Sequence, residues 1–155
     1  MIRPATPADA EALAALWNPW IRDTAITFTA TLKTPADLVQ MIATRPAFFT
    51  TDDHAGLATY GQFRGGDGYA TCMEHTIILA SAARGRGLGR ALMQAVESHA
   101  RDHGAHQMIA GISGENPAAI AFHARLGYAE IARVTEAGRK FGRFIDLVLM
   151  RKFLS

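Results

Sequence analysis

The chain has 155 residues, a length typical of one domain, and we expect residues 1–155 to form a single domain. Hydrophobic residues make up 49% and charged residues 19% of the chain, which is the composition of a globular fold rather than of a disordered chain. The formal net charge is only +2 and the basic residues are scattered, so a nucleic-acid partner is not expected.

The first half of the chain predicts a strand, two helices and then more strands. Residues 2–5 read as a short strand, and Thr6 as the N-cap of a helix with Pro7 in its first position. The same start signal recurs in residues 34–37, Thr-Pro-Ala-Asp, and Pro46 ends that second helix. A glycine-rich turn is expected over residues 65–68. The strands expected around it cover residues 48–51, 57–63 and 69–79.

The second half alternates helices with strands. A helical pattern runs from Leu88 to His103, with Gly104 as its C-cap. Asn116 and Pro117 start a shorter helix that continues through Leu126. The strands of this half are expected over residues 108–112, 129–136 and 144–153, the last two joined by a loop containing Gly138 and Gly142. The order β-α-α-β-β-β-α-β-α-β-β predicts an α/β fold, a mixed sheet with helices on both faces.

A glycine-rich segment stands between an apolar strand and the first turn of a helix. Residues 84–90 read Arg-Gly-Arg-Gly-Leu-Gly-Arg. Glycines let the backbone approach a ligand, and the free amides of a helix start favour an anion, so we expect a phosphate or pyrophosphate. The spacing fits neither a P-loop nor a dinucleotide fingerprint. An ordinary glycine-rich turn is the alternative interpretation.

Together with three further segments, this loop resembles the GNAT family of N-acetyltransferases. Residues 73–79 (Met-Glu-His-Thr-Ile-Ile-Leu), residues 116–128 (Asn-Pro-Ala-Ala-Ile-Ala-Phe-His-Ala-Arg-Leu-Gly-Tyr) and residues 138–146 (Gly-Arg-Lys-Phe-Gly-Arg-Phe-Ile-Asp) are similar to motifs of its phosphinothricin and methionine sulfoximine N-acetyltransferase group. The last segment is the most specific, because the GNAT family at large does not share it. The resemblance covers nearly the whole chain and implies the GNAT fold, with a mostly antiparallel central sheet.

The resemblance also implies the reaction and the cofactor. An amine attacks the thioester of acetyl-CoA directly, and no metal is required. The backbone of Ile77, Ile78 and Leu79 would bind the pantetheine arm as an added strand. Asn116 would bind the same arm, although an N-cap role before Pro117 explains it equally well. The residues expected around the pyrophosphate are Arg84, Gly85, Arg86, Gly87, Leu88, Gly89 and Arg90.

Two residues are candidates for proton transfer. Glu74 lies on a largely apolar strand face, where a carboxylate has the raised pKa that a general base needs; an exposed or ion-paired glutamate is the alternative. His123 stands where many GNAT enzymes carry a tyrosine that acts as general acid, and an imidazole can serve as acid or base near neutral pH. A histidine that only packs against its neighbours is the other interpretation.

The substrate side is marked less clearly. Relatives that acetylate methionine sulfoximine hold it with an arginine just before the Glu-His segment, and this chain has Ala70 in that stretch. Phe28, Tyr69 and Arg143 are the predicted substrate-binding residues, with Arg139 as an alternative to Arg143 for a substrate carboxylate. The Trp17 and Trp20 pair is expected in the helix core instead.

Rival functions remain at this stage. The acceptor amine could be a peptide N-terminus or a lysine rather than a small amino-acid-like molecule, or the chain could bind acyl-CoA without catalysis. His99, His103 and His106 resemble metal ligands at first sight, but no acidic or cysteine ligand is spaced to complete a site, so a solvated helix face is expected. The relatives imply a homodimer.

The cellular context follows from three observations. Cys72 is the single cysteine, so the chain cannot form an internal disulfide. No apolar run approaches the roughly 20 residues of a membrane-spanning helix, and residues 1–4, Met-Ile-Arg-Pro, lack a signal peptide's apolar core. These observations predict a cytoplasmic protein without a membrane partner.

Overall fold

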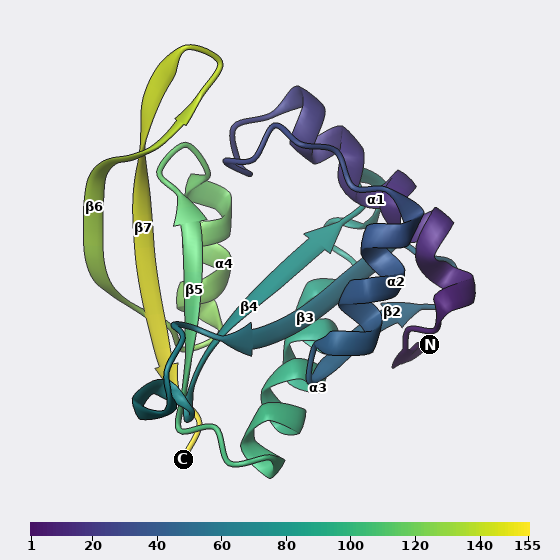
Figure 1. The fold of residues 1–155 in the computed structure, drawn as a ribbon. Coiled ribbons are helices and arrows are strands. Elements are labelled where there is room, and N and C mark those ends of the chain that lie inside the picture. Colours follow the sequence, from purple (N-terminus) through teal and green to yellow (C-terminus); the bar gives the residue numbers. More distant parts are fainter.

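A seven-stranded sheet organises the computed structural model, which describes residues 1–155 (Figure 1). Its strands lie in the order β1-β2-β3-β4-β5-β7-β6, and only the β4–β5 pair is parallel. The strands are β1 (Ile2–Pro4), β2 (Ala47–Thr51), β3 (Gly56–Gln62), β4 (Cys72–Leu79), β5 (Gln107–Ser113), β6 (Ala129–Lys140) and β7 (Arg143–Phe153). The helices are α1 (Ala10–Asp23), α2 (Pro35–Thr44), α3 (Leu88–Asp102) and α4 (Pro117–Arg125). The element order and the mostly antiparallel sheet are those predicted.

Strands β4 and β5 separate after a short region of pairing. Their ladder joins only Cys72, Met73 and Glu74 to residues 107–109, although β4 continues to Leu79 and β5 to Ser113. The two strands diverge widely beyond this point (Figure 1). The remaining length of β4 therefore has no strand partner on its β5 side, and main-chain groups that point there are left outside the sheet ladder.

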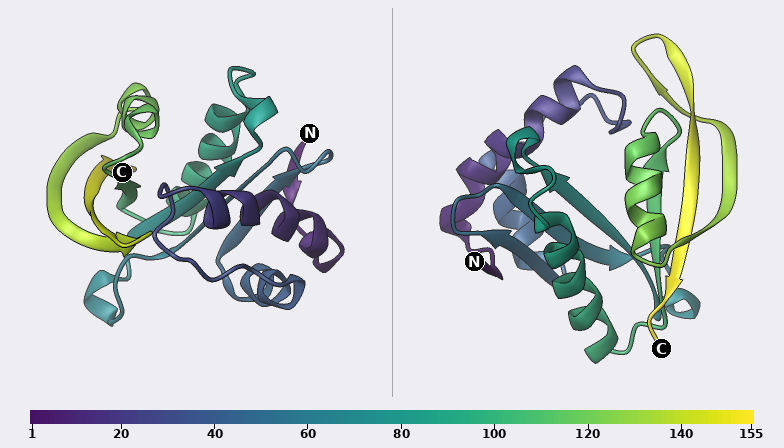
Figure 2. Two further views of the ribbon diagram at one scale, coloured as in Figure 1. Left: turned by 90° about the horizontal axis from the view of Figure 1, so that it is seen from above. Right: turned by 180° about the vertical axis from the view of Figure 1, so that it is seen from behind.

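Each face of the sheet carries its own core, with α1 and α2 on one face and α3 and α4 on the other (Figure 2). The α1–α2 core packs helix residues such as Leu13 and Leu38 against Leu57 and Ile78 of the sheet. The α3–α4 core packs Leu92 and Val96 against β3, β5 and β7. Because strand side chains alternate between faces, β4 contributes Ile78 to one core and Ile77 to the edge of the other.

Several predicted boundaries were wrong for local reasons. Residues 69–71 do not extend β4. Asp67–Tyr69 forms a 3₁₀ turn in which the Tyr69 amide donates to the Gly66 carbonyl oxygen, and β4 starts at Cys72. The first helix begins with a 3₁₀ turn at Pro7–Asp9 before α1 continues it.

The prediction that His99 lies on a solvated helix face was wrong. Its ring is half-buried and hydrogen-bonded to the Tyr60 hydroxyl.

The closing hairpin is longer than predicted. Strand β6 runs to Lys140, and only Phe141 and Gly142, both with positive φ, form the turn. Gly138 lies within β6, where it pairs with Ile145 of β7, rather than in a loop. The Phe28 ring occupies the space above it, so that an added Cβ would come within 2.6 Å of that ring. Two segments more than a hundred residues apart in sequence are thus packed together.

The Lys140 ammonium group fixes this contact. Its Nζ donates to the carbonyl oxygens of Ile21 and Thr24 at 2.6 Å each, and to that of Thr27 at 2.8 Å. These carbonyls belong to the last turn of α1 and the segment that follows it, where a helix leaves acceptors without intrahelical donors. Lys140 is buried, and its hydrogen bonds tie the β6–β7 hairpin to the segment after α1.

None of the four α-helices has the length and the apolar character that a membrane-spanning helix requires.

Replacing Lys140 with methionine should cost about 2–3 kcal/mol of unfolding free energy, because three buried or half-buried carbonyls lose their donor. Urea unfolding would measure the loss. Arg139→Met changes an exposed neighbour on the same strand and should stay within about 0.5 kcal/mol of the parent. Equal effects of the two substitutions would show that the Lys140 hydrogen bonds contribute little.

Candidate active site

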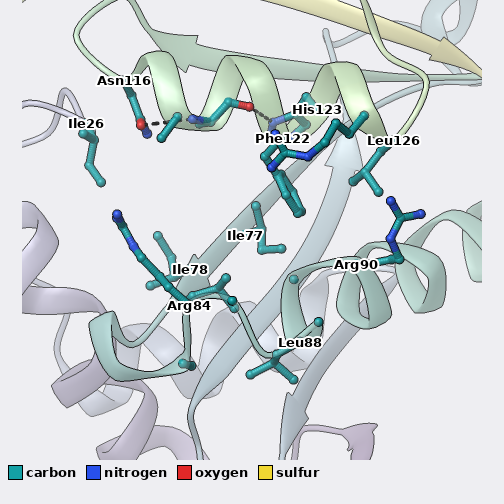
Figure 3. Close-up of a pocket in the computed structure, with 18 of the residues that line it drawn as sticks. Ile26, Ile77, Ile78, Arg84, Leu88, Arg90, Asn116, Phe122, His123 and Leu126 are labelled. Atoms are coloured by element: carbon teal, nitrogen blue, oxygen red, sulfur yellow. Dashed lines mark hydrogen bonds between the residues drawn. The ribbon is translucent and has the colours of Figure 1, made fainter.

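A cavity of about 450 Å³ opens where β4 and β5 separate, between the start of α3 and helix α4 (Figure 3). It is lined by Trp20, Ile26, Ile77, Ile78, Leu79, Ala83, Arg84, Gly85, Gly87, Leu88, Gly89, Arg90, Asn116, Ala118, Ala119, Phe122, His123, Arg125 and Leu126. The cavity brings together every residue predicted to bind the cofactor except Arg86, and also the candidate acid His123.

The glycine loop forms the basic end of the cavity. Gly85 and Gly87 have φ values of +75° and +76°, a conformation that residues with a Cβ rarely adopt. Gly87 is the N-cap of α3 and makes no side-chain capping bond, so the first amides of the helix remain available to a ligand. Arg84 and Arg90 extend toward α4 in Figure 3. These amides and guanidinium groups suit a polyanionic ligand.

Arg86 does not line this cavity. Its side chain is exposed, and its positive charge helps to lower the pKa of Asp53. A contact between Arg86 and the pyrophosphate stays a prediction.

Trp20 packs against the α1–α2 core, as predicted, and it also lines the cavity. Its indole Nε1 donates to the carbonyl oxygen of Leu79 at 3.0 Å, and the Arg84 guanidinium lies 5.4 Å from its ring centroid. Trp17, one helical turn earlier, is only 6% exposed and belongs to the α1–α2 core, as predicted. Trp20 thus orients the end of β4 and the first arginine of the loop.

Helix α4 closes the cavity opposite the loop. The Asn116 side chain accepts a hydrogen bond from the Ala119 amide at 3.2 Å, so it caps the helix as well as lining the cavity. Phe122 approaches Gly89 so closely that an added Cβ there would lie 3.1 Å from its ring. Sequence analysis assigned Phe122 no role. It lies four residues before Leu126, so both residues are on the helix face that meets α3.

His123 is buried and both of its ring nitrogens are engaged. Nδ1 lies 2.7 Å from the Ala119 carbonyl oxygen, which only accepts, so Nδ1 carries the hydrogen. In the neutral ring Nε2 then accepts from His75 Nε2 at 3.1 Å. Burial lowers the pKa of both histidines, that of His75 to about 3. Proton transfer by His123 would require the hydrogen bond to His75 to open, and its role as general acid stays a prediction.

His75 completes this pair, and sequence analysis assigned it no function. Strand alternation places it on the face opposite Glu74, toward α4, where its ring stacks on that of His123 at a centroid distance of 5.0 Å. If Nε2 donates to His123, Nδ1 of His75 is an acceptor, and this atom is buried without a hydrogen-bond partner. Strand alternation could have predicted the face on which His75 lies, but not its contact with His123, 48 residues away.

Glu74 lies at the point where β4 and β5 separate, on the face that carries α1 and α2. Its Oε2 sits over Gly111 of β5, 2.9 Å from where a Cβ would be. Burial raises the pKa of the Glu74 carboxyl, and the positive charge of Arg45 acts in the opposite direction. Glu74 has no hydrogen-bonded or ion-paired partner, so the alternative of an ion-paired glutamate is not what the structure shows. A half-buried carboxylate with a raised pKa suits a general base.

The three predicted substrate residues are not gathered at one place. Phe28 packs on Gly138 near the cavity residue Ile26. Arg143 forms a two-pronged ion pair with Glu115, at 2.7 Å and 3.0 Å. Tyr69 precedes β4, whereas the cavity lies at the opposite end of that strand, and Tyr69 is exposed beneath the Arg64 guanidinium. Phe28 and Arg143 therefore lie near cavity residues, since Glu115 directly precedes Asn116, whereas Tyr69 does not.

A helix start that suits an anion, beside two diverging strands, is an arrangement suited to an acyl-CoA-dependent transferase. Residues 12–128 match the model of the acetyltransferase (GNAT) family. The chain belongs to that family and is an N-acetyltransferase, as the resemblance implied.

Two curated relatives are similar to this chain over most of its length. The chain is 34% identical to the L-methionine sulfoximine/L-methionine sulfone acetyltransferase of Pseudomonas aeruginosa, covering 97% of this chain and 92% of the relative. It is 32% identical to the phosphinothricin N-acetyltransferase of Streptomyces coelicolor, covering 94% and 91%.

Two solved structures match the whole fold. That of yncA from Salmonella typhimurium, with its cofactor acetyl-CoA, has a TM-score of 0.94 and 30% identity over 100% of this chain and 94% of that one. The ribosomal-protein-alanine N-acetyltransferase of Brucella melitensis has a TM-score of 0.93 and 34% identity over 99% of both chains.

Gly87→Ala should weaken acetyl-CoA binding roughly 5- to 30-fold. A left-handed conformation costs a residue with a Cβ about 1–2 kcal/mol, so the free loop relaxes and must be re-formed on binding. Calorimetric titration would measure the affinity. Gly104→Ala is the matched control, because Gly104 also has a positive φ with open space around it but lies beyond the far end of α3. Equal affinities of the two variants would contradict this account of the loop.

The buried His75 should make the fold sensitive to acid. Its pKa is lowered to about 3 in the folded protein, whereas an unfolded histidine titrates near 6.5. The unfolded state therefore binds more protons below pH 6.5, and stability falls as the pH drops from 6.5 toward 3. Between pH 7 and pH 5 this residue alone should cost about 2 kcal/mol.

Urea unfolding of the parent and of His75→Phe at both pH values would measure that difference. Phenylalanine does not titrate, so the variant should lose less stability on acidification than the parent. Parallel losses in the two proteins would show that His75 does not cause the sensitivity.

Proposed function

We propose that the protein transfers the acetyl group of acetyl-CoA directly to the amine of a small amino-acid-like substrate, such as methionine sulfoximine, methionine sulfone or phosphinothricin. The observation that carries this proposal is the free edge of β4. It links the anion-binding start of α3 to Glu74, so a cofactor held along the edge would present its reactive end near a base.

The cavity residues fit acetyl-CoA, which supplies the acetyl thioester. The amides and arginines at the start of α3 would hold its pyrophosphate. The main-chain groups of residues 77–79 that face away from β3 would bind the pantetheine arm as an additional strand, and the Asn116 side-chain amide would donate to the same arm. A backbone amide at the end of β4, that of Leu79 in our assignment, would stabilise the negative oxygen that develops at the carbonyl.

Glu74 is the proposed general base. A free aliphatic amine is mostly protonated at neutral pH, because its pKa lies near that of lysine, about 10.4, so a proton must leave before attack. The raised pKa of the Glu74 carboxyl suits it to accept that proton, directly or through a water molecule. His123 is proposed to act on the leaving thiolate once its bond to His75 opens.

Two observations support a small acceptor: the names of the relatives, and the packing of the segment after α1 against the β6–β7 hairpin. The two curated relatives carry names of enzymes for small amino-acid analogues. The Phe28–Gly138 contact and the Lys140 hydrogen bonds hold the segment after α1 against the β6–β7 hairpin, which leaves less room for a peptide there. A peptide N-terminus is the second candidate, because the Brucella melitensis structure is named as a ribosomal-protein-alanine N-acetyltransferase.

We further propose a homodimer formed by a single-domain cytoplasmic chain. Strand β6 is exposed along nearly its whole length, and Phe141 and Phe144 at the hairpin tip are 54% and 57% exposed. Large exposed apolar side chains of this kind are common at interfaces between protein subunits.

Release of thiol from acetyl-CoA tests the function. The panel contains methionine sulfoximine, methionine sulfone, phosphinothricin, free amino acids, and peptides with a free N-terminus or lysine. Turnover with the first three compounds is expected. Turnover with peptides alone would overturn the substrate class, and acetyl-CoA binding without any turnover would overturn catalysis.

Glu74→Gln should lower kcat roughly 10²- to 10⁴-fold while acetyl-CoA binding is unchanged, because only the base is lost. A base works when deprotonated, and burial raises the pKa of Glu74, so parent activity should fall with decreasing pH at a pH above the value of about 4.3 for an ordinary glutamate. Glu130→Gln, an exposed change on β6, is the control. An unaltered pH profile in Glu74→Gln would mean that another group is the base.

A further inference from the structure

Arg45 is a cation that the proposed reaction has not used, although it lies beside the base. It immediately follows α2, as the C-cap residue of that helix, and its guanidinium extends over Gly61 of β3: an added Cβ at Gly61 would lie 2.9 Å from Arg45 Nη1. Gly61 and Glu74 are direct partners in the β3–β4 ladder. Side chains of paired residues project from the same face of a sheet, so the Arg45 guanidinium and the Glu74 carboxylate share one face.

The Arg45 guanidinium has no partner within the protein. It is half-buried, yet it forms no hydrogen bond and no ion pair. It also borders an open polar hollow between α2 and residues 29–33. The other charged groups there are occupied, because Asp37 accepts the Thr34 amide and Lys33 lies 4.9 Å from the Trp17 ring centroid. Arg45 is therefore free to bind an anion.

An α-amino acid presents the base with a difficulty that Arg45 solves. Its amine and its carboxylate are attached to the same carbon atom, so delivering the amine to Glu74 brings a second carboxylate close to the first. Two like charges at such a distance repel each other strongly in a partly buried site. A guanidinium beside them offsets this repulsion and can bind the carboxylate with two hydrogen bonds.

The remaining arginines near the site are poorer candidates. Arg143 is already paired with Glu115, and Arg139 is exposed on the hairpin with its guanidinium 4.6 Å from the Phe144 ring centroid. Ala70, just before the Glu-His segment, carries no charge. Arg45 reaches the face of the sheet that carries Glu74 from the end of α2.

We propose that Arg45 binds the α-carboxylate of the amino-acid substrate while Glu74 receives the proton of its amine. This inference rests on the proposed function and deepens it, because it makes the carboxylate a required part of the substrate. Binding of that carboxylate also neutralises the charge that lowers the pKa of Glu74, so an amino-acid substrate makes its own base stronger.

A pair of acceptors isolates the carboxylate. Methionine sulfone and 3-(methylsulfonyl)propylamine differ only by that group, and kcat and KM are measured with each at saturating acetyl-CoA. Arg45→Gln should raise the KM for methionine sulfone roughly 10- to 100-fold, the range for a lost charge-assisted hydrogen bond. The KM for the amine should change less than about twofold. Arg45→Lys keeps the charge without the two-pronged geometry and should be intermediate.

Gly61→Ala displaces the guanidinium without removing it, since the new methyl group would occupy the position beside Nη1. It should raise the KM for methionine sulfone selectively, though less than Arg45→Gln. Arg22→Gln is the matched control, because Arg22 is exposed on α1 and pairs only with Asp23; it should alter neither KM.

The outcomes separate the inference from the function on which it rests. Equal changes for the two acceptors in Arg45→Gln, or no change, would overturn the role of Arg45 and leave the proposed function standing. A parent protein that acetylates neither acceptor, nor any other member of the amino-acid panel, would overturn both.

Discussion

The separation of β4 from β5 is the constraint on which the rest of the site depends. Parallel strands normally pair along their length, but here the ladder covers only Cys72, Met73 and Glu74. The candidate site is arranged around the main chain that has no strand partner on this side. The glycine loop continues from the end of β4, α4 lies across the gap, and Glu74 occupies the last paired position. An unpaired strand edge is costly in a protein interior unless a ligand satisfies it, so the fold provides a binding edge by omitting hydrogen bonds.

The two faces of β4 carry different electrostatic environments. On the α4 face, His75 and His123 are buried together, and burial lowers the pKa of both rings, which favours their neutral forms. On the α1–α2 face, Glu74 and Arg45 are only half-buried and remain without protein partners. Glu74 and His75 are consecutive residues, so strand alternation places them on opposite faces. One face thus carries a neutral hydrogen-bonded pair of histidines, and the other carries two charged side chains without protein partners. This division fits a site that receives its cofactor and its acceptor from different sides of one strand.

Much of this arrangement could be predicted from the sequence, because it depends on local signals. Capping residues such as Thr34 and Asn116 located helix starts, and the alternation of glycines in residues 84–90 located the glycine loop at the start of α3. The predictions that were wrong involve contacts between distant segments. Gly138 was interpreted as a loop residue because glycine is a common turn signal, and its contact with the distant Phe28 ring cannot be foreseen. Trp20 packs against the core, as predicted, but its additional place at the cavity depends on a hydrogen bond to Leu79, 59 residues away. The periodicity of a sequence predicts which face of a helix or strand is buried, but not which distant residues that face contacts.

The Lys140 hydrogen bonds have a consequence for how such enzymes diversify. One ammonium group holds the backbone of residues 21–27 against a hairpin that begins more than a hundred residues later. The segment after α1 and the hairpin therefore form a single structural unit. This segment, transplanted without its hairpin into a protein that lacks Lys140 and Gly138, would lose the lysine that holds it, or would meet a side chain where Phe28 now rests on Gly138. Recombination within the family should consequently preserve function when both segments are exchanged together, even though they lie far apart in the gene.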